Sequence, residues 1–132
     1  MKIWPNLEQR SEAWFKARAG RPTASKFSKI ITAASGRLSQ QAEDYMIELI
    51  ADCICPGESD WGGNKFTDYG EELEPEARKC FEQVMGLNVE QPGFITRDDE
   101  VVGCSPDGLV LDAQGEYIAG LEIKCLLPKS GL

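Results

Sequence analysis

The segments Ser105-Pro106-Asp107-Gly108-Leu109-Val110 and Leu121-Glu122-Ile123-Lys124-Cys125 decide the fold expected for the C-terminal part of the chain. Their apolar residues and the turn residues between them are typical of two short strands joined as a hairpin. A hairpin that turns at Gln114-Gly115 places Asp107 directly opposite Glu122. The sequence therefore predicts that these two carboxylates lie close together.

Two opposed acidic side chains indicate a bound cation. Directly opposed residues have Cβ atoms about 4.5–5.5 Å apart, and like charges that close are unfavourable unless a cation lies between them. Carboxylate oxygens together with waters suit octahedral Mg²⁺. Lys124 follows Glu122 by two residues and projects from the same face of the strand. The prediction is a metal-binding pair, Asp107 and Glu122, with an amine beside it.

A plainer interpretation stays open at this point. Asp107-Gly108 can be only a turn, and Glu122 and Lys124 can be an exposed strand face. The spacing of these three residues is common by chance. The hairpin register and the apolar residues around the trio favour the metal site. Charged side chains at the rim of a buried sheet lose contact with water, and a bound cation compensates for that loss.

Outside the hairpin, the pattern predicts helices first and strands afterwards in one domain, residues 1–132, of α+β class with a mostly antiparallel or mixed sheet. The expected helices are Leu7–Arg18, Ala24–Ala34, a longer one from a Ser39 cap to Cys53, and Thr67–Met85. The expected strands are Val89–Gln91, Phe94–Arg97, Val101–Cys104, Leu109–Leu111 and Tyr117–Lys124. Pro56–Gly63 is expected to be a loop.

Several single residues carry expectations about the helices. Thr23 is a plausible N-cap, and Gly86 is expected at the C′ position of the last helix. Pro75 predicts a kink or a helix start near Glu74-Pro75, because proline removes an internal hydrogen bond. The expected buried face of the third helix consists of Ala42, Tyr45, Met46, Leu49 and Ile50.

Composition excludes several classes of protein and of chemistry. The formal net charge of −8 opposes non-specific coating of nucleic acid, so a DNA enzyme of this composition needs a local basic groove and metal ions. The chain has no histidine, which removes imidazole bases and His-ligated zinc. Its five cysteines lack a CxxC pair and indicate buried free thiols in a reduced, intracellular protein. The N-terminal Met-Lys-Ile-Trp-Pro lacks the long apolar h-region of a signal peptide, and no apolar run approaches the roughly 18 residues of a membrane span.

Four ordered blocks resemble a known family. Trp14-Phe15-Lys16-Ala17-Arg18-Ala19-Gly20 with Thr23-Ala24-Ser25 is similar to its N-terminal W-x3-R-x-G-x2-TAS block. Tyr69–Arg78 resembles its G-x3-E-x2-AR helix, and Cys104–Leu109 and Leu121–Cys125 resemble its SPDG and LE-hydrophobic-KC blocks. On these motifs the chain resembles the lambda exonuclease, or YqaJ-type viral recombinase, group of the PD-(D/E)XK nucleases along nearly its whole length.

The resemblance implies an activity and its partners. Such enzymes degrade one strand of linear double-stranded DNA from the 5′ end with Mg²⁺, for which Mn²⁺ can substitute. The expected partners are DNA ends, a phage single-strand annealing protein and further copies in a ring-shaped trimer, in the cytoplasm of a bacterial host.

The resemblance also implies roles for individual residues. Asp107, Glu122, the Ile123 carbonyl and Glu74 are expected to hold metal, and Lys124 is expected to orient or activate the attacking water. Arg18, Ser25 and Ser105 match positions that hold the terminal 5′ phosphate. From the residues alone, Arg18 can serve the helix C-terminal dipole, Ser25 can be an ordinary early-helix residue, and Glu74 can belong to a solvated helix face.

The chain departs from the family pattern in two places. Leu126-Leu127 precede Pro128, where the family continues directly with proline after the cysteine, and the chain stops at Leu132. Family members run on through a helix with a further active-site glutamine and at least one more strand. A C-terminally incomplete domain is therefore expected, and a non-catalytic remnant that binds DNA ends or a partner protein is the alternative function. A structural α+β module with a coincidental acidic pair is the third hypothesis.

Overall fold

A computed structural model of the chain describes residues 1–4, 6–56 and 65–125, except for the side chains of 65–69 and 71. The predicted loop 56–63, apart from Pro56, and Leu126-Leu127-Pro128 lie outside the described residues. The chain divides into two compact units, one of Met1–Trp61 and Pro92–Ser105, the other of Gly62–Gln91 and Pro106–Leu132. Each unit carries its own three-stranded antiparallel sheet.

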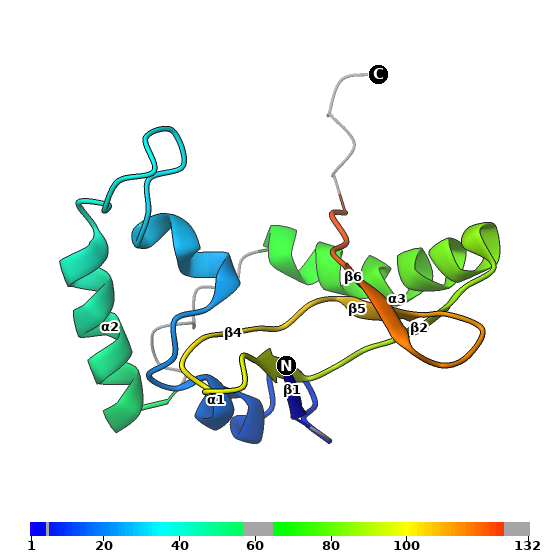
Figure 1. Cartoon of the computed structure of the whole chain (residues 1–132), viewed down its shortest axis with the longest axis horizontal. Coiled ribbons are helices and arrows are strands. Elements are labelled where there is room, and N and C mark those ends of the chain that lie inside the picture. Colours follow the sequence, from blue (N-terminus) through cyan, green and yellow to red (C-terminus); the bar gives the residue numbers. More distant parts are fainter. Residues whose placement is uncertain (5, 57–64, 126–132) are drawn as a thin grey trace. The chain divides into compact units, whose positions relative to one another are not determined.

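The first unit combines a small sheet with three short helices (Figure 1). Its elements are β1 (Lys2–Trp4), α1 (Glu12–Arg18), the 3₁₀ helix η1 (Ala24–Lys29), α2 (Ala42–Ile54), β3 (Phe94–Thr96) and β4 (Gly103–Cys104). The strand order is β1-β3-β4, with Ile3 opposite Ile95 and Ile95 opposite Cys104. The core lies where α1 packs on β3, and it consists of Trp14, Ala17 and the fully buried Phe94.

Helix α1 begins five residues later than the sequence pattern predicts, at Glu12 rather than Leu7. Ser11 is its N-cap, and its side chain accepts a hydrogen bond from the backbone N–H of Trp14 at 3.2 Å. The preceding residue, Arg10, has a φ of 70°, which a right-handed helix excludes. The helix therefore presents Trp14, Ala17 and Arg18 on its last two turns.

The helix predicted at Ala24–Ala34 is a 3₁₀ helix that ends at Lys29. Ile30, Ile31 and Thr32 follow, and these β-branched residues favour extended backbone. Ile31 forms a bridge with Leu38 across the turn at Ser35-Gly36. Thr23 stands at the N-cap position as expected, but its side chain makes no capping hydrogen bond.

Helix α2 differs from the prediction in its cap and in its buried face. Its N-cap is Gln41, while Ser39 Oγ accepts from the Gln41 backbone N–H at 3.2 Å just before the helix. Of the five residues expected to be buried, only Tyr45 is buried in the described structure, and Met46 and Ile50 are each 56% exposed. The helical spacing of apolar residues therefore predicted the buried side of α2 correctly only at Tyr45.

The second unit packs one long helix against the other sheet. Its elements are α3 (Lys65–Met85), β2 (Asn88–Glu90), β5 (Gly108–Leu111) and β6 (Tyr117–Leu121), with strand order β2-β5-β6. Gly86 follows α3 with a φ of 64°, as a C′ glycine should. Pro75 lies inside the continuous helix, so the predicted helix start near Glu74-Pro75 is wrong.

Two sheets replace the single expected sheet, and two of the three boundaries between the units lie at prolines. These two boundaries fall between Gln91 and Pro92 and between Ser105 and Pro106. Proline has no backbone N–H to donate to a strand ladder, so each ladder is interrupted there. The order of helices followed by strands holds except for β1, which precedes the helices and was not predicted.

The burial of the cysteines differs from what the composition predicts. All five cysteines are free, but none is buried, since Cys53, Cys55 and Cys80 are exposed and the other two are half-buried. The expectation of buried thiols is therefore wrong. Within the described ranges, no helix has the length and apolar character that crossing a bilayer requires.

Candidate active site

The hairpin of β5 and β6 has the register that the sequence predicts. Gly108 pairs with Leu121, Leu109 with Gly120 and Val110 with Ala119. Asp107 and Glu122 are the next residues on each strand, one position beyond the last pair. The turn follows Asp112, whose carboxylate accepts from the backbone N–H groups of Gln114 and Glu116. Gly115 completes it with a φ of 82°.

One irregularity lies near the turn and leaves the site end of the hairpin unchanged. Leu111 pairs with Tyr117 while Val110 pairs with Ala119, so Ile118 is an extra, bulged residue. Strand β6 ends at Leu121, whereas the prediction extended it to Lys124. Glu122, Ile123 and Lys124 therefore continue the chain without strand pairing.

Asp107 is held from two sides at the start of β5. Its carboxylate accepts a hydrogen bond from the backbone N–H of Ile123. Its own carbonyl oxygen accepts from Arg78 Nε at 2.9 Å. The half-buried Asp107 carboxylate thus lies against the peptide that joins Glu122 to Ile123. This contact links the two ends of the hairpin at the predicted metal site.

Lys124 and Glu122 form an ion pair on the exposed side of the same segment. Lys124 Nζ donates to Glu122 Oε1, and the side chains are 74% and 60% exposed. The hydrogen bond with Glu122 raises the pKa of Lys124, and the charges of Glu122, Asp107 and Glu74 add to that rise, while burial opposes it. The negative charges of these three carboxylates therefore favour the protonated form of the Lys124 amine.

Glu74 belongs to the packed side of α3. Its side chain is 22% exposed, while Glu72 and Glu76 are exposed. Arg78, which is 14% exposed and one turn later, donates to Glu74 Oε1 at 2.7 Å. Gln91 Nε2 lies at 3.4 Å from the same oxygen. The interpretation of Glu74 as part of a solvated face is therefore wrong.

The oxygen donors of this unit fit a magnesium ion. In the described part of the chain, no three acidic or cysteine side chains gather closely enough to form a metal cluster by themselves. Mg²⁺, however, takes only one or two carboxylates and keeps several waters or substrate oxygens. Asp107 and Glu122 are the two carboxylates that one ion would take, together with the Ile123 carbonyl, and Glu74 would lie near a second metal position. All four offer oxygen, the donor type that Mg²⁺ prefers.

In the first unit, Arg18 and Ser105, two of the residues that the resemblance assigns to phosphate binding, contact each other. Arg18 NH1 donates to Ser105 Oγ at 3.2 Å. The Arg18 guanidinium also lies over the indole ring of Trp14, 4.1 Å from the ring centroid. Trp14 Nε1 donates to Ser105 Oγ at 3.0 Å and to the Gly93 carbonyl at 2.9 Å. The three side chains form one closed group.

Ser25 is not brought into this group by a hydrogen bond. It is exposed on η1, and its hydroxyl lies 3.3 Å from Thr23 Oγ1, its one side-chain partner among the residues described. Of the three residues expected to hold phosphate, Arg18 and Ser105 therefore contact each other, and Ser25 lies apart from them among the described contacts.

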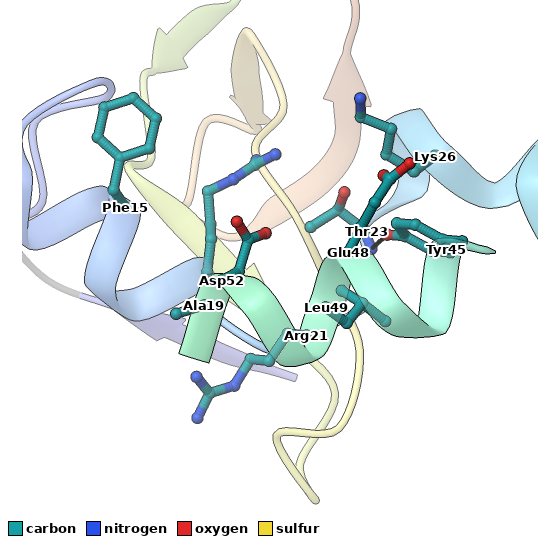
Figure 2. A pocket seen from close by; sticks show the side chains of 10 residues that line it. Phe15, Ala19, Arg21, Thr23, Lys26, Tyr45, Glu48, Leu49 and Asp52 are labelled. Atoms are coloured by element: carbon teal, nitrogen blue, oxygen red, sulfur yellow. Dashed lines mark hydrogen bonds between the residues drawn. The ribbon is translucent and has the colours of Figure 1, made fainter. Parts of the chain in front are cut away.

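A small pocket borders Arg18 (Figure 2). Its volume is about 30 Å³, which is the room of a single water molecule. Figure 2 shows Lys26, Glu48 and Tyr45 close together at one end, where the Tyr45 hydroxyl accepts from the Thr23 backbone N–H at 3.3 Å. The pocket is too small to enclose a nucleotide.

The chain matches one known protein family over most of its length. Residues 13–130 match the model of the YqaJ-like viral recombinase domain. The chain belongs to this family. The match includes all four blocks from which the resemblance was first inferred. The earlier assignment to the lambda exonuclease, or YqaJ-type, group is thereby confirmed.

Solved structures agree with the family. The crystal structure of an alkaline exonuclease, LHK-Exo, from Laribacter hongkongensis has a TM-score of 0.68 and 35% identity, over 91% of this chain and 55% of that one. LHK-Exo in complex with dAMP has a TM-score of 0.62 and 36% identity, over 77% of this chain and 49% of that one. No curated protein matches significantly. This YqaJ-like chain thus spans about half the length of these structures, and its α+β class with antiparallel sheets is confirmed.

Two residues that contact the predicted site residues were not themselves among them. Arg78 contacts both Glu74 and Asp107, and Trp14 contacts both Arg18 and Ser105. Each lies four residues from a predicted site residue on a helix, a spacing at which side chains meet. That spacing is the signal that could have identified both.

Proposed function

We propose that this chain is a magnesium-dependent 5′–3′ exonuclease that acts on linear double-stranded DNA in phage-type recombination. One observation carries the proposal: Asp107 accepts from the Ile123 N–H, which brings its carboxylate to the segment that bears Glu122 and Lys124. Family membership and the likeness to alkaline exonuclease structures support the reaction class.

The proposed ligands are Asp107, Glu122, the Ile123 carbonyl and Glu74. When bound there, Mg²⁺ supplies charge stabilisation for the phosphoryl oxygens and lowers the pKa of a bound water. Mn²⁺ is expected to substitute. The chain holds these ligands in place through the β5–β6 register, the Ile123 N–H and the Arg78 guanidinium.

Lys124 is proposed to orient the attacking water. Its pairing with Glu122 and the charges of Asp107 and Glu74 keep it protonated, and a protonated amine donates hydrogen bonds. It therefore orients the water through the water's oxygen and also offsets negative charge on the phosphate.

Recognition of the DNA end is proposed to rest on a terminal 5′ phosphate. The planar guanidinium of Arg18 suits phosphate oxygens, and Ser105 contributes one hydroxyl. Ser25 is proposed as a further contact that depends on the bound DNA. A local site of this kind is needed because the chain carries a formal net charge of −8.

The test is digestion of a linear duplex with a 5′ phosphate and a distinct label at each end of one strand, in Mg²⁺. The wild type should release mononucleotides from the 5′ end, and EDTA should stop the release. Asp107→Asn keeps an oxygen that can accept from Ile123 N–H but removes the charge, so the rate should fall at least about a hundredfold. Glu116→Gln, on the exposed turn of the same hairpin, is the control and should leave the rate unchanged.

Other outcomes would refute parts of the proposal. Equal rates for the wild type and Asp107→Asn would remove Asp107 from the reaction. Release from the 3′ end would overturn the proposed polarity. Internal cuts in a covalently closed circle would replace the exonuclease by an endonuclease.

A second candidate function is a remnant that binds DNA ends or a partner protein without cleaving. The observation in its favour is that no three acidic or cysteine side chains gather into a metal cluster among the described residues. It predicts end binding in Ca²⁺ together with no release in Mg²⁺ or Mn²⁺. The trimer, the annealing-protein partner and the bacterial cytoplasm stay proposals, and light scattering of the purified chain tests the first of them.

A further inference from the structure

The hydroxyl of Ser105 has a defined polarity. A serine hydroxyl offers one O–H donor and two lone pairs. Arg18 NH1 donates to Ser105 Oγ at 3.2 Å, and Trp14 Nε1 donates to the same oxygen at 3.0 Å. Both lone pairs are therefore occupied by groups that can only donate, because neither a guanidinium nor an indole N–H accepts a hydrogen bond.

The remaining O–H of Ser105 can only donate. Among the described residues, no acceptor for this proton is found, and the side chain is half-buried. An unpaired donor beside the cationic Arg18 is complementary to an anionic oxygen. The polarity of this hydroxyl is thus set for a ligand with oxygens of the phosphate type.

Trp14 holds this arrangement by two contacts beyond the one with Ser105. Its N–H is shared with the Gly93 carbonyl at 2.9 Å, which fixes the plane of the indole. The face of the same ring lies 4.1 Å from the Arg18 guanidinium carbon, a cation–π contact that keeps the fork in one orientation. One buried side chain therefore touches two of the three proposed phosphate contacts, Arg18 and Ser105.

We propose that Trp14 is a positioning residue for the terminal phosphate: its indole N–H commits Ser105 to donate toward the ligand, and its ring aligns Arg18. This inference rests on the proposed function, because it deepens the proposed phosphate site. Trp14 itself touches no phosphate in this account. It acts through its two neighbours.

A purely structural role for Trp14 is the competing explanation. Trp14 is 8% exposed and belongs to the core with Ala17 and Phe94. A phenylalanine supplies most of this apolar packing and an aromatic face for Arg18, but no N–H. Trp14→Phe therefore separates the packing role from the hydrogen-bonding role.

The chain contains a matched control for this substitution. Trp4 lies in the same unit and is half-buried, and its Nε1 donates to Thr96 Oγ1 at 3.2 Å. It also lies below a cation, since Arg21 is 5.4 Å from its ring centroid. Trp4→Phe removes the same chemical group from a similar environment without touching Arg18 or Ser105.

The experiment measures affinity for duplexes that carry either a 5′ phosphate or a 5′ hydroxyl, with Ca²⁺ in place of Mg²⁺ so that no cleavage occurs. In the wild type, the phosphorylated end should bind more tightly. Trp14→Phe should reduce this preference about tenfold, the lower range for a hydrogen bond to a charged group. Trp4→Phe should preserve it. In a Ser105→Ala background, Trp14→Phe should have little further effect, because the hydroxyl it orients is gone.

A second readout uses the unsubstituted protein. The indole N–H signals of Trp14 and Trp4 in ¹⁵N-edited spectra, assigned with Trp4→Phe and Trp61→Phe so that Trp14 follows as the third signal, should respond differently. The Trp14 signal should shift when the phosphorylated duplex is added and not with the hydroxyl duplex, and the Trp4 signal should stay. This measurement keeps the inference testable if Trp14→Phe unfolds in a thermal melt.

The outcomes distinguish a failure of the proposed role of Trp14 from a failure of the proposed phosphate site. If the wild type prefers the phosphorylated end and Trp14→Phe keeps the full preference, Trp14 is a core residue only and the inference is overturned while the phosphate site stands. If the wild type itself shows no preference, the proposed phosphate site fails, and the role of Trp14 fails with it. Equal losses for Trp14→Phe and Trp4→Phe also overturn the inference.

Discussion

Arg78 donates through Nε to the backbone carbonyl of Asp107 at 2.9 Å, and this bond joins helix α3 to the first residue of the candidate metal site. The other side of the same guanidinium donates to Glu74 at 2.7 Å. A planar fork can serve two such acceptors at once, whereas the single ammonium of lysine cannot reproduce that geometry. Arg78 thus fixes the separation of two proposed metal ligands.

Replacing Arg78 should weaken both the fold and metal binding. Arg78→Met leaves the Asp107 carbonyl and the Glu74 carboxylate without their donor, which costs about 1–3 kcal/mol of unfolding free energy. The affinity for Mn²⁺, measured by titration calorimetry, should fall about tenfold or more, as is typical when a residue that orients a metal ligand is removed. Arg78→Lys should recover part of the stability and little of the metal affinity.

Lys79 provides the control for Arg78. It is the next residue on α3 and is exposed. Lys79→Met removes one positive charge from the same helix without touching Glu74 or Asp107. If Lys79→Met weakened Mn²⁺ binding as much as Arg78→Met, the effect would be one of net charge, and the orienting role of Arg78 would be wrong.

Glu74 itself can be tested against a neighbour of the same charge. Glu74→Gln should weaken Mn²⁺ binding, because a half-buried carboxylate that faces Arg78 is replaced by a neutral amide. Glu76→Gln removes an equal charge from an exposed position on the same helix and should have no effect. Equal affinities for the wild type and Glu74→Gln would exclude Glu74 from the metal site.

Gly108, the residue after Asp107, allows β2 to approach β5 closely. A Cβ atom on Gly108 would lie 2.4 Å from Val89 Cγ1, a distance that forces one strand to move. Gly108→Ala should therefore destabilise the fold by about 1–3 kcal/mol in urea denaturation, as overpacking does. It should also lower the cleavage rate, because Asp107 is the adjacent residue.

The same hairpin contains a glycine with open space around it. A Cβ on Gly120 would meet nothing within 4 Å, so Gly120→Ala should leave stability and rate nearly unchanged. Adding Val89→Ala to Gly108→Ala removes the clashing methyl and should restore part of the lost stability. A tolerated Gly108→Ala, with stability equal to that of Gly120→Ala, would contradict the steric explanation.

The sequence predicted the site hairpin well because its determinants are local. Gln114-Gly115 sets the turn, and the pairing of Gly108 with Leu121 follows by counting along both strands. The bulge at Ile118 was not visible in the sequence, yet it did not alter the pairing at the site end. The residues of the turn were therefore enough to predict the strand register next to Asp107 and Glu122.

Other features depend on contacts that no local pattern reveals. The late start of α1 follows from Arg10, whose φ of 70° is set by its surroundings rather than by helix propensity. Strand β1 consists of three residues and exists only through its pairing with β3. The division into two sheets coincides with Pro92 and Pro106, and the strand pattern alone does not show which strands pair with which.

Tyr117 and Glu90 connect the two outer strands of the sheet that carries the candidate metal site. Tyr117, at the start of β6, donates its hydroxyl proton to Glu90 Oε2 on β2 at 2.8 Å. The hydrogen bond to Glu90 is the largest cause that raises the pKa of Tyr117, with burial and the charge of Glu90 as smaller causes. The bond exists only while the tyrosine keeps its proton.

Stability should therefore depend on pH through Tyr117. Because its pKa is higher in the folded than in the unfolded chain, the stabilising effect is fully present below the unfolded value, about 10, and is lost as pH rises through the folded pKa. Glu90→Gln should lower the pKa of Tyr117, as measured by tyrosinate absorbance at about 295 nm with Tyr117→Phe as the reference spectrum. It should also flatten the decline of stability above about pH 10. A Tyr117 titration that is identical with and without the Glu90 carboxylate would show that the bond does not persist in solution.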